Sequence, residues 1–267
     1  MRASGKTIVV TGGGNGIGRA LVLALLAKGS RVAAVDISDA GLAETREMAG
    51  AAADRLSTHA LNITDRAAVE ALPSLVITAH GQVDGLINCA GIIQPFVRIN
   101  DLGYDAIERV INVNLWGVIN MTKTFLPYLM ERPEAHLVNI SSMGSYVPVP
   151  GQTLYGATKA AVKLFTEGLR SELAGTSVSV TVAFPGSTST EISKNSGVEI
   201  KADGIDASKY KMTSADDAAQ RIIAGMERNA YHAFAGDDAQ MMDRLSRLMP
   251  ERAAQIIQKS MAALLDQ

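Results

Sequence analysis

A glycine-rich turn between a buried strand and an amphipathic helix lies near the start of the chain. The β-branched run at residues 7–10 is typical of a buried strand. Glycines follow at positions 12, 13, 14, 16 and 18, and apolar residues then recur at helical spacing as far as Lys28. Glycines let a backbone approach a pyrophosphate, and a helix N-terminus offers it free N–H groups. This order predicts a βα unit with a phosphate-binding turn, although a plain tight turn would have a similar composition.

Predicted strands and helices alternate along the rest of the chain. Further strands are expected at residues 31–35, 56–63, 83–87, 136–140, 177–184 and 231–235. Helices are expected at residues 40–53, 65–80, 105–130, 155–174 and 215–228. Such alternation indicates βαβ units and a mainly parallel sheet. We therefore expect an α/β fold of the Rossmann type, with a doubly wound, seven-stranded sheet that carries helices on both faces.

Several residues interrupt the predicted helices. Pro73 predicts a kink or restart in the helix at 65–80, and Pro127 a kink or end in the helix at 105–130. Asn112 and Asn114 lie inside that second helix, where an amide side chain competes for backbone hydrogen bonds. One of these asparagines could be kept for a buried polar role. The alternative is an asparagine that the helix merely tolerates, and the sequence pattern is the same for both.

Length and composition favour one domain. The 267 residues and 47% hydrophobic content are enough to bury a large core, and the chain shows no linker or repeat. We expect a single domain over residues 1–267, a polar and weakly periodic lid at about 187–210, and a helical tail at about 239–265 broken by Pro250.

Charge and cysteine content exclude several classes of partner. The net charge is -2 with both signs dispersed, which does not indicate nucleic acid or an anionic membrane. Cys89 is the single cysteine, and no Cys/His spacing is typical of a metal site. Residues 1–6 lack the apolar segment of a signal peptide, and no apolar run is long enough to cross a bilayer. We expect a cytoplasmic protein that uses no metal.

Tyr155 and Lys159 are four residues apart on a predicted helix, so they lie on one face of it. A free tyrosine has a pKa of ~10, and a neighbouring ammonium lowers that pKa because it favours the phenolate. A tyrosine tuned in this way can exchange a proton with an alcohol oxygen. A tyrosine and a lysine at this spacing also occur by chance on exposed helices. The pair therefore indicates a catalytic site only if other motifs of the chain support it.

Asp36 ends the second predicted strand. A carboxylate there can accept both ribose hydroxyls of an adenosine, and it repels a 2′-phosphate. Ile37 beside it and Asn15 in the glycine turn carry no positive charge. The pattern favours NAD over NADP. Asp36 could instead cap the next turn, together with Ser38 or Asp39, and the two roles are compatible.

In their order and spacing, these motifs resemble the short-chain dehydrogenase/reductase family from about residue 6 to residue 235. The residues that carry the resemblance are Thr11, Gly12, Gly16, Gly18, Asn88, Ala90, Gly91, Asn114, Ser142, Tyr155, Lys159, Pro185 and Gly186. The resemblance implies an NAD-dependent oxidoreductase that interconverts a secondary alcohol and a ketone.

The resemblance implies a role for each catalytic position. Tyr155 would be the general acid/base, and Lys159 would lower its pKa and hold the nicotinamide ribose. Ser142 would orient the substrate oxygen, and Asn114 would support a water that links Lys159 to solvent.

The resemblance also implies the contacts with NAD. The expected residues are Gly12, Asn15, Gly16, Ile17, Gly18, Asp36, Asn62, Ile63, Asn88, Ala90, Gly91, Tyr155, Lys159, Pro185, Gly186, Thr188 and Thr190. Asn62 stands where the family more often has Asp, and Cys89 where it more often has Asn. We expect Asn62 beside the adenine and Cys89 as structural filler.

Substrate and assembly are less defined. Ile93, Met143, Tyr146 and Gln152 are candidate walls for a medium-sized, fairly apolar alcohol or ketone. Family members commonly pair their two long helices, so we expect a homodimer or homotetramer.

Two other functions remain open at this point. One is a dehydratase or epimerase that retains its NAD, and the other is a catalytically silent NAD-sensing or scaffold protein on the same fold. The complete set of Asn114, Ser142, Tyr155 and Lys159 argues against silence, because a scaffold has no need of all four.

Overall fold

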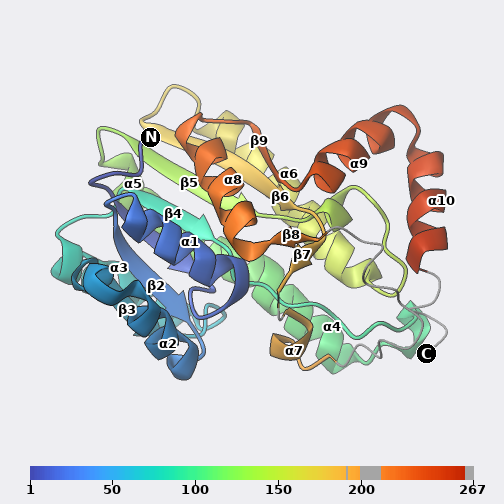
Figure 1. Cartoon of the computed structure of the whole chain (residues 1–267), viewed down its shortest axis with the longest axis horizontal. Coiled ribbons are helices and arrows are strands. Elements are labelled where there is room, and N and C mark those ends of the chain that lie inside the picture. The colour runs from blue at the N-terminus through green and yellow to red at the C-terminus, as the bar shows by residue number, and fades with distance from the viewer. Residues whose placement is uncertain (191, 199–211, 262–267) are drawn as a thin grey trace.

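A seven-stranded parallel sheet forms the centre of the computed structural model, which describes residues 1–190, 192–198 and 212–261 (Figure 1). The strand order is β3-β2-β1-β4-β5-β6-β9, and every neighbouring pair is parallel. The strands are β1 (Thr7–Thr11), β2 (Arg31–Asp36), β3 (Leu56–Ala60), β4 (Gly85–Asn88), β5 (Ala135–Ile140), β6 (Val178–Pro185) and β9 (His232–Ala235). This confirms the predicted doubly wound sheet.

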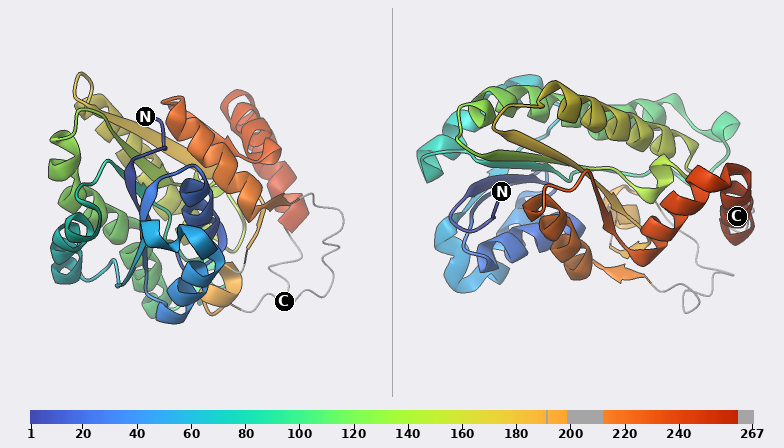
Figure 2. Two further views of the ribbon diagram at one scale, coloured as in Figure 1. Left: turned by 60° about the vertical axis from the view of Figure 1, so that its left-hand side comes forward. Right: turned by 90° about the horizontal axis from the view of Figure 1, so that it is seen from above.

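Helices cover both faces of the sheet (Figure 2). One face carries α1 (Gly16–Ala27), α2 (Asp39–Ala49) and α8 (Ala215–Glu227). The other carries α3 (Arg66–His80), α4 (Tyr104–Ile111), α5 (Gly117–Met130) and α6 (Thr153–Glu172). Because both faces are covered, the strands are buried on both sides, which explains their nearly continuous apolar runs.

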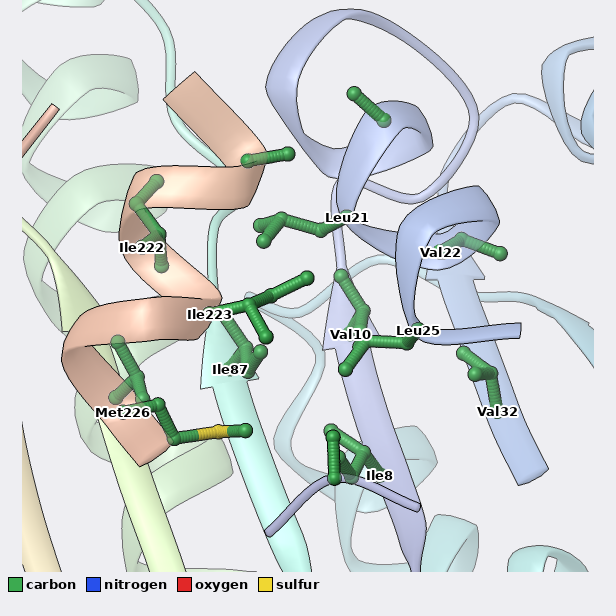
Figure 3. Close-up of a cluster of buried hydrophobic side chains, with 14 of the residues drawn as sticks. Ile8, Val10, Leu21, Val22, Leu25, Val32, Ile87, Ile222, Ile223 and Met226 are labelled. Carbon is green, nitrogen blue, oxygen red and sulfur yellow. The ribbon is translucent and has the colours of Figure 1, made fainter. Parts of the chain in front are cut away.

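Two hydrophobic cores result from this arrangement. In the first, Val10 of β1 packs with Leu21 and Leu25 of α1 and with Ile223 of α8 (Figure 3). The second lies on the opposite face, where α5 contributes Phe125. Together these cores hold the carboxyl ends of β1 and β4 in place, and the strand order reverses between these two strands. Ligands of open α/β sheets bind at such a point.

The predicted helix at 105–130 follows one path but is not uniform. A π-helical turn at Asn112–Trp116 separates α4 from α5, and Asn114 is fully buried within that turn. Pro127 lies inside α5 without ending it, and α3 likewise runs through Pro73 without a restart. A proline removes one backbone hydrogen bond, which core packing on both sides of it can offset.

Other boundaries differ slightly from the predictions. The helix expected at 40–53 ends as an α-helix at Ala49, and a 3₁₀ segment, Gly50–Arg55, follows. Short 3₁₀ segments also occur at Ile99–Asp101 and Met143–Ser145. None of the helices described here is long and apolar enough to cross a membrane.

The tail forms two helices, α9 (Asp237–Leu248) and α10 (Pro250–Met261), which lie at one end of the molecule (Figure 1). The break at Pro250 was predicted, and the structure shows that Pro250 is the first residue of the second helix. The expected lid at 187–210 falls partly outside the described residues. Its described part contains β7 (Thr188–Ser189), which pairs with β8 (Thr213–Ser214), and the short α7 (Ile192–Asn195).

Candidate active site

A cavity of about 1140 Å³ opens at the carboxyl ends of the strands. Most residues predicted to contact NAD line it, and so do Ser142 and Cys89. These predicted residues are Gly12, Asn15, Gly16, Ile17, Gly18, Asp36, Asn62, Ile63, Ala90, Gly91, Tyr155, Lys159, Pro185, Gly186, Thr188 and Thr190. The fold therefore gathers into one cavity residues that are widely separated in the sequence.

The glycine turn at the cavity wall requires glycine at two positions. Gly12 has a φ of 72°, and a Cβ there would lie 3.0 Å from the Cα of Ala90. A Cβ on Gly18 would lie 1.9 Å from the carbonyl oxygen of Gly12. Asn15 caps α1, because its side chain accepts a hydrogen bond from Gly16 N over 2.6 Å. The N-terminus of α1 thus meets the cavity beside a narrow backbone cradle, which fits a pyrophosphate.

Asp36 holds this turn from the end of β2. Its Oδ2 accepts from Gly14 N and its Oδ1 accepts from Ser38 N, both over 2.9 Å. Ser38 in turn caps α2 by accepting from Gly41 N. The capping role is therefore present, and the carboxylate retains lone pairs for a further donor in the cavity.

Arg19 lines the same part of the cavity and was not predicted as a site residue. Its guanidinium forms an ion pair with Glu44 over 2.6 Å and donates to Thr45 Oγ1 over 3.1 Å. It also donates to the carbonyl oxygen of Gly14. Glu44 and Thr45 belong to α2, so only the tertiary fold could show that the charge of Arg19 is paired.

Tyr155, Ser142 and Lys159 line another part of the cavity. Tyr155 and Lys159 extend from α6, and Ser142 follows β5. The Oγ of Ser142 accepts from Gly144 N over 3.0 Å, and Ser142 and Tyr155 both flank Gly144, where a Cβ would lie 3.5 Å from Ser142 Oγ and 3.6 Å from the Tyr155 ring. The Nζ of Lys159 donates to the carbonyl oxygen of Ile140 over 3.0 Å. These contacts place a hydroxyl, a phenol and an amine along one wall.

Burial dominates the ionisation of this group. Burial raises the pKa of Tyr155 above its ordinary value, and the neighbouring Ser142 side chain opposes that shift. Burial lowers the pKa of Lys159 to about 8. The predicted lowering of the Tyr155 pKa by Lys159 is therefore wrong for this arrangement. The amine is bonded to Ile140 and lies 5.9 Å from the centroid of the Tyr155 ring.

Asn114 fixes the segment that leaves β4. Its Nδ2 donates to the carbonyl oxygen of Ile92, and its Oδ1 accepts from Ile92 N, both over 2.9 Å. Nδ2 also donates to Thr158 Oγ1 of α6 over 3.2 Å. A Cβ on Gly91 would lie 3.1 Å from Lys159 Nζ and 3.3 Å from Asn114 Oδ1. The buried side chain is thus a clamp beside Lys159, and its part in a proton relay remains a prediction.

Asn88 does not line the cavity formed by the described residues, in contrast to the predicted contact with NAD. Its side chain lies inside the protein, where Nδ2 donates to Asn139 Oδ1 over 2.8 Å and to Thr122 Oγ1 over 3.2 Å. It links β4 to β5 and α5. Burial raises the pKa of the adjacent Cys89 to about 12, so that thiol stays protonated, in keeping with a structural role.

The candidate substrate walls divide between two places. Ile93 lines the main cavity, whereas Tyr146 and Gln152 line a separate cavity of about 340 Å³. The hydroxyl of Tyr146 donates to the carbonyl oxygen of Ala239 over 2.8 Å. Met143 packs against the tail helices. Tyr146 and Gln152 thus lie outside the main cavity of the described residues, and their role as substrate walls stays a prediction.

Comparison with known proteins shows what this chain is similar to. A family model described as short chain dehydrogenase matches residues 6–201. A protein of Mycobacterium tuberculosis that carries the name oxidoreductase SadH is 37% identical over 255 residues, which are 92% of this chain and 91% of that protein.

Two solved structures show the same fold with a nucleotide. A 3-ketoacyl-(acyl-carrier-protein) reductase from Brucella melitensis, complexed with NADH, has a TM-score of 0.77 at 26% identity and covers 88% of this chain and 98% of its own. A short chain dehydrogenase from Burkholderia cenocepacia, in complex with NADP, has a TM-score of 0.80 at 25% identity, with 96% and 99% covered.

Proposed function

The chain belongs to the short-chain dehydrogenase/reductase family, and on that premise we propose that it is an NAD-dependent oxidoreductase which interconverts a secondary alcohol and a ketone. The observation that carries the proposal is that Ser142, Tyr155 and Lys159 lie together in the same cavity as the glycine turn. A hydroxyl next to a phenol can hold an alcohol oxygen and exchange its proton.

Each part of the cavity has a task in this chemistry. A bound nicotinamide dinucleotide supplies the hydride acceptor or donor. The glycine turn and the N-terminus of α1 bind its pyrophosphate, and Lys159 binds the nicotinamide ribose. Ser142 holds the substrate oxygen. In reduction the phenol of Tyr155 gives its proton to the carbonyl oxygen, and in oxidation the phenolate form of Tyr155 accepts the hydroxyl proton.

Asp36 supports NAD rather than NADP as the cofactor. A 2′-phosphate near its carboxylate would meet a like charge. Arg19, a cation in the adjacent wall, is already paired with Glu44. The solved relatives include one with NADH and one with NADP, so the preference rests on these side chains.

Exposed apolar side chains on the long helices support a homodimer or homotetramer. Trp116 in the π turn is 48% exposed, and Leu164 on α6 is 70% exposed. Light scattering on the purified protein measures the mass, and a monomer at micromolar concentration would contradict the proposed assembly.

The function is tested with a panel of secondary alcohols of increasing size, each offered with NAD and with NADP. We expect the absorbance of the reduced nicotinamide to appear with NAD and with the medium-sized apolar alcohols. The matching ketones with NADH should show the reverse change. Nucleotide binding without turnover of any substrate would contradict the proposal and favour a silent nucleotide-binding protein.

A further inference from the structure

The first turn of α6, which carries Tyr155, is capped by a residue from another segment. Gln152 occupies the N-cap position, but its side chain makes no capping bond. Instead, Oε1 of Gln94 accepts hydrogen bonds from Leu154 N over 2.8 Å and from Tyr155 N over 2.9 Å. These N–H groups belong to the first turn, where a helix offers no carbonyl partner of its own. Gln94 therefore does what a local Ser, Thr or Asp usually does at a helix start.

Gln152 returns the contact. Its Nε2 donates to the main-chain carbonyl oxygen of Gln94 over 2.7 Å. Each glutamine thus binds the backbone of the other's segment. Both side chains are buried, with Gln94 at 0% and Gln152 at 4% exposure. This exchange joins the segment after β4 to the start of α6.

The orientation of the Gln94 amide follows from its surroundings. Two N–H donors face one end of it, so the oxygen must be at that end. Its Nε2 is then buried, with no hydrogen-bond partner among the described residues. A buried donor without a partner is costly, and few are found in native proteins. An apolar residue here would avoid that cost but would leave the N–H groups of Leu154 and Tyr155 without an acceptor. The acceptor is therefore the useful part of the side chain.

The segment that holds Gln94 is itself fixed against the active-site cavity. Asn114 binds both main-chain polar groups of Ile92, and Ser196 Oγ accepts from Ile93 N over 3.0 Å. Gly91 lies directly against Lys159. A displacement of Tyr155 relative to this segment is thus a displacement relative to the cavity wall.

We propose that Gln94 is a positioning residue for the reaction, acting through the main-chain N–H of Tyr155 to set where the phenol lies against the Gly91–Ile93 wall. Gln94 is fully buried and is not among the described residues that line the cavity. The proposal rests on the proposed function, in which Tyr155 exchanges the proton. A small misplacement of a reacting group is enough to reduce a rate strongly.

The central variant is Gln94→Met, which keeps the length of the side chain and removes the acceptor. We expect kcat to fall about 10- to 100-fold. The dissociation constant of NADH, measured by fluorescence, should stay unchanged, because the nucleotide contacts are untouched. Gln94→Glu restores an acceptor oxygen at the same place and should recover most of the lost kcat.

Asp84→Asn serves as the matched control for lost stability. Asp84 is also a buried acceptor, which binds Thr7 N and Arg132 Nε over 2.9 Å each. It precedes β4, at the end of the sheet opposite the cavity. We expect this variant to lower the melting temperature and to leave kcat unchanged.

Two outcomes would overturn the positioning role. In one, Gln94→Met keeps the wild-type kcat at a lower melting temperature. In the other, it weakens NADH binding as much as it lowers kcat. Hydrogen exchange tests the cap itself: the amides of Leu154 and Tyr155 should exchange faster in Gln94→Met than in Asp84→Asn, and equal rates would contradict it.

A wild-type protein that turns over no alcohol would refute the proposed function. The role of Gln94 in placing Tyr155 is then tested by a measurement that does not depend on turnover. Ultraviolet titration, with Tyr155→Phe as the reference, reports the pKa of the Tyr155 phenol. Burial is the largest influence on that pKa and raises it, while Ser142 lowers it and Cys89 raises it. A displaced ring gains solvent, so Gln94→Met should move the pKa of Tyr155 down towards ~10. An unmoved pKa would overturn the inference.

Discussion

The carboxylate of Asp238 accepts a hydrogen bond from the main-chain N–H of Ser187 over 2.7 Å, across 51 positions of sequence. Asp238 lies in the first turn of α9, so this bond ties the tail to the turn that follows β6. A Cβ on Gly186 would lie 2.1 Å from Asp238 Oδ1. The tail thus helps to shape the cavity wall next to Pro185 and Gly186.

Gly186→Ala should disrupt this contact, because the added methyl group and the Asp238 carboxylate need the same space. We expect a loss of stability of about 1–3 kcal/mol, as for other overpacked sites. Nucleotide affinity should fall as well, since the cavity wall must move. Thermal unfolding and NADH titration measure the two effects. Gly168→Ala on α6, where a Cβ meets nothing within 4 Å, is the control and should be neutral or stabilising.

Tyr155→Phe removes the phenol oxygen and keeps the ring. If Tyr155 exchanges the proton, kcat should fall by about 10²–10⁴ or more, while NADH binding stays close to that of the wild type. Steady-state kinetics and nucleotide titration separate the two. Tyr104→Phe removes the same atom from a side chain that is 81% exposed, and it should leave kcat unchanged. Near-normal turnover by Tyr155→Phe would refute the assignment.

Asp36→Asn removes the charge at the end of β2 and keeps an oxygen and much of the shape. We expect kcat/KM with NADP to rise relative to NAD by about tenfold, which corresponds to ~1.4 kcal/mol of relieved repulsion. Asp39→Asn removes an equal charge from the exposed start of α2 and should change the ratio little. Wild-type activity with NADP and none with NAD would show that Asp36 does not set the preference.

Lys159→Met should separate stability from activity. Burial lowers the pKa of Lys159 to about 8, whereas an unfolded lysine titrates at ~10.4. Between these pH values the unfolded chain binds the extra proton, so this residue makes the native state more stable as the pH rises. At neutral pH its buried ammonium opposes folding. We expect Lys159→Met to melt at or above the wild-type temperature near pH 7 and to lose most of its turnover. A clear drop in melting temperature would contradict this account.

His136 should make the protein sensitive to mild acid. It is fully buried in β5, and burial lowers its pKa to about 3. Because an unfolded histidine binds a proton below ~6.5, this group contributes stability above that pH, and the contribution is lost as the pH falls. The slope between the two values is up to about 1.4 kcal/mol per pH unit. His136→Gln removes the titrating group and should show a shallower fall in urea midpoint with acid. An identical slope would contradict the role of His136.

The sheet could be predicted from the sequence because its strands are buried on both faces. Runs such as residues 7–10 and 136–140 carry the signal within a few positions. The gathering of site residues followed from the same prediction, since parallel strands bring their carboxyl ends to one edge. Asn88 shows the limit: its place at a strand end was predictable, but not that its side chain points into the interior.

Effects that depend on burial or on distant partners could not be predicted. The spacing of Tyr155 and Lys159 suggested a lowered tyrosine pKa, and burial, which spacing does not report, reverses the direction. Gln94 accepts from amides 60 and 61 positions away, and its sequence neighbourhood contains no motif that points to them. The pairing of Arg19 could not be predicted for the same reason, because its partner Glu44 lies 25 positions away.

The π turn at Asn112–Trp116 also has a consequence for insertions and deletions. A π turn contains about one residue more than an α turn over the same stretch of axis, so it behaves as a one-residue insertion absorbed within a helix. Deleting Val113 would convert the turn to regular α-helix and change the direction in which the Asn114 side chain points relative to α4 and α5. Its amide would then leave Ile92. At this point the length of the chain matters more than the chemistry of any single side chain, and natural variation here should be in residue identity and not in residue number.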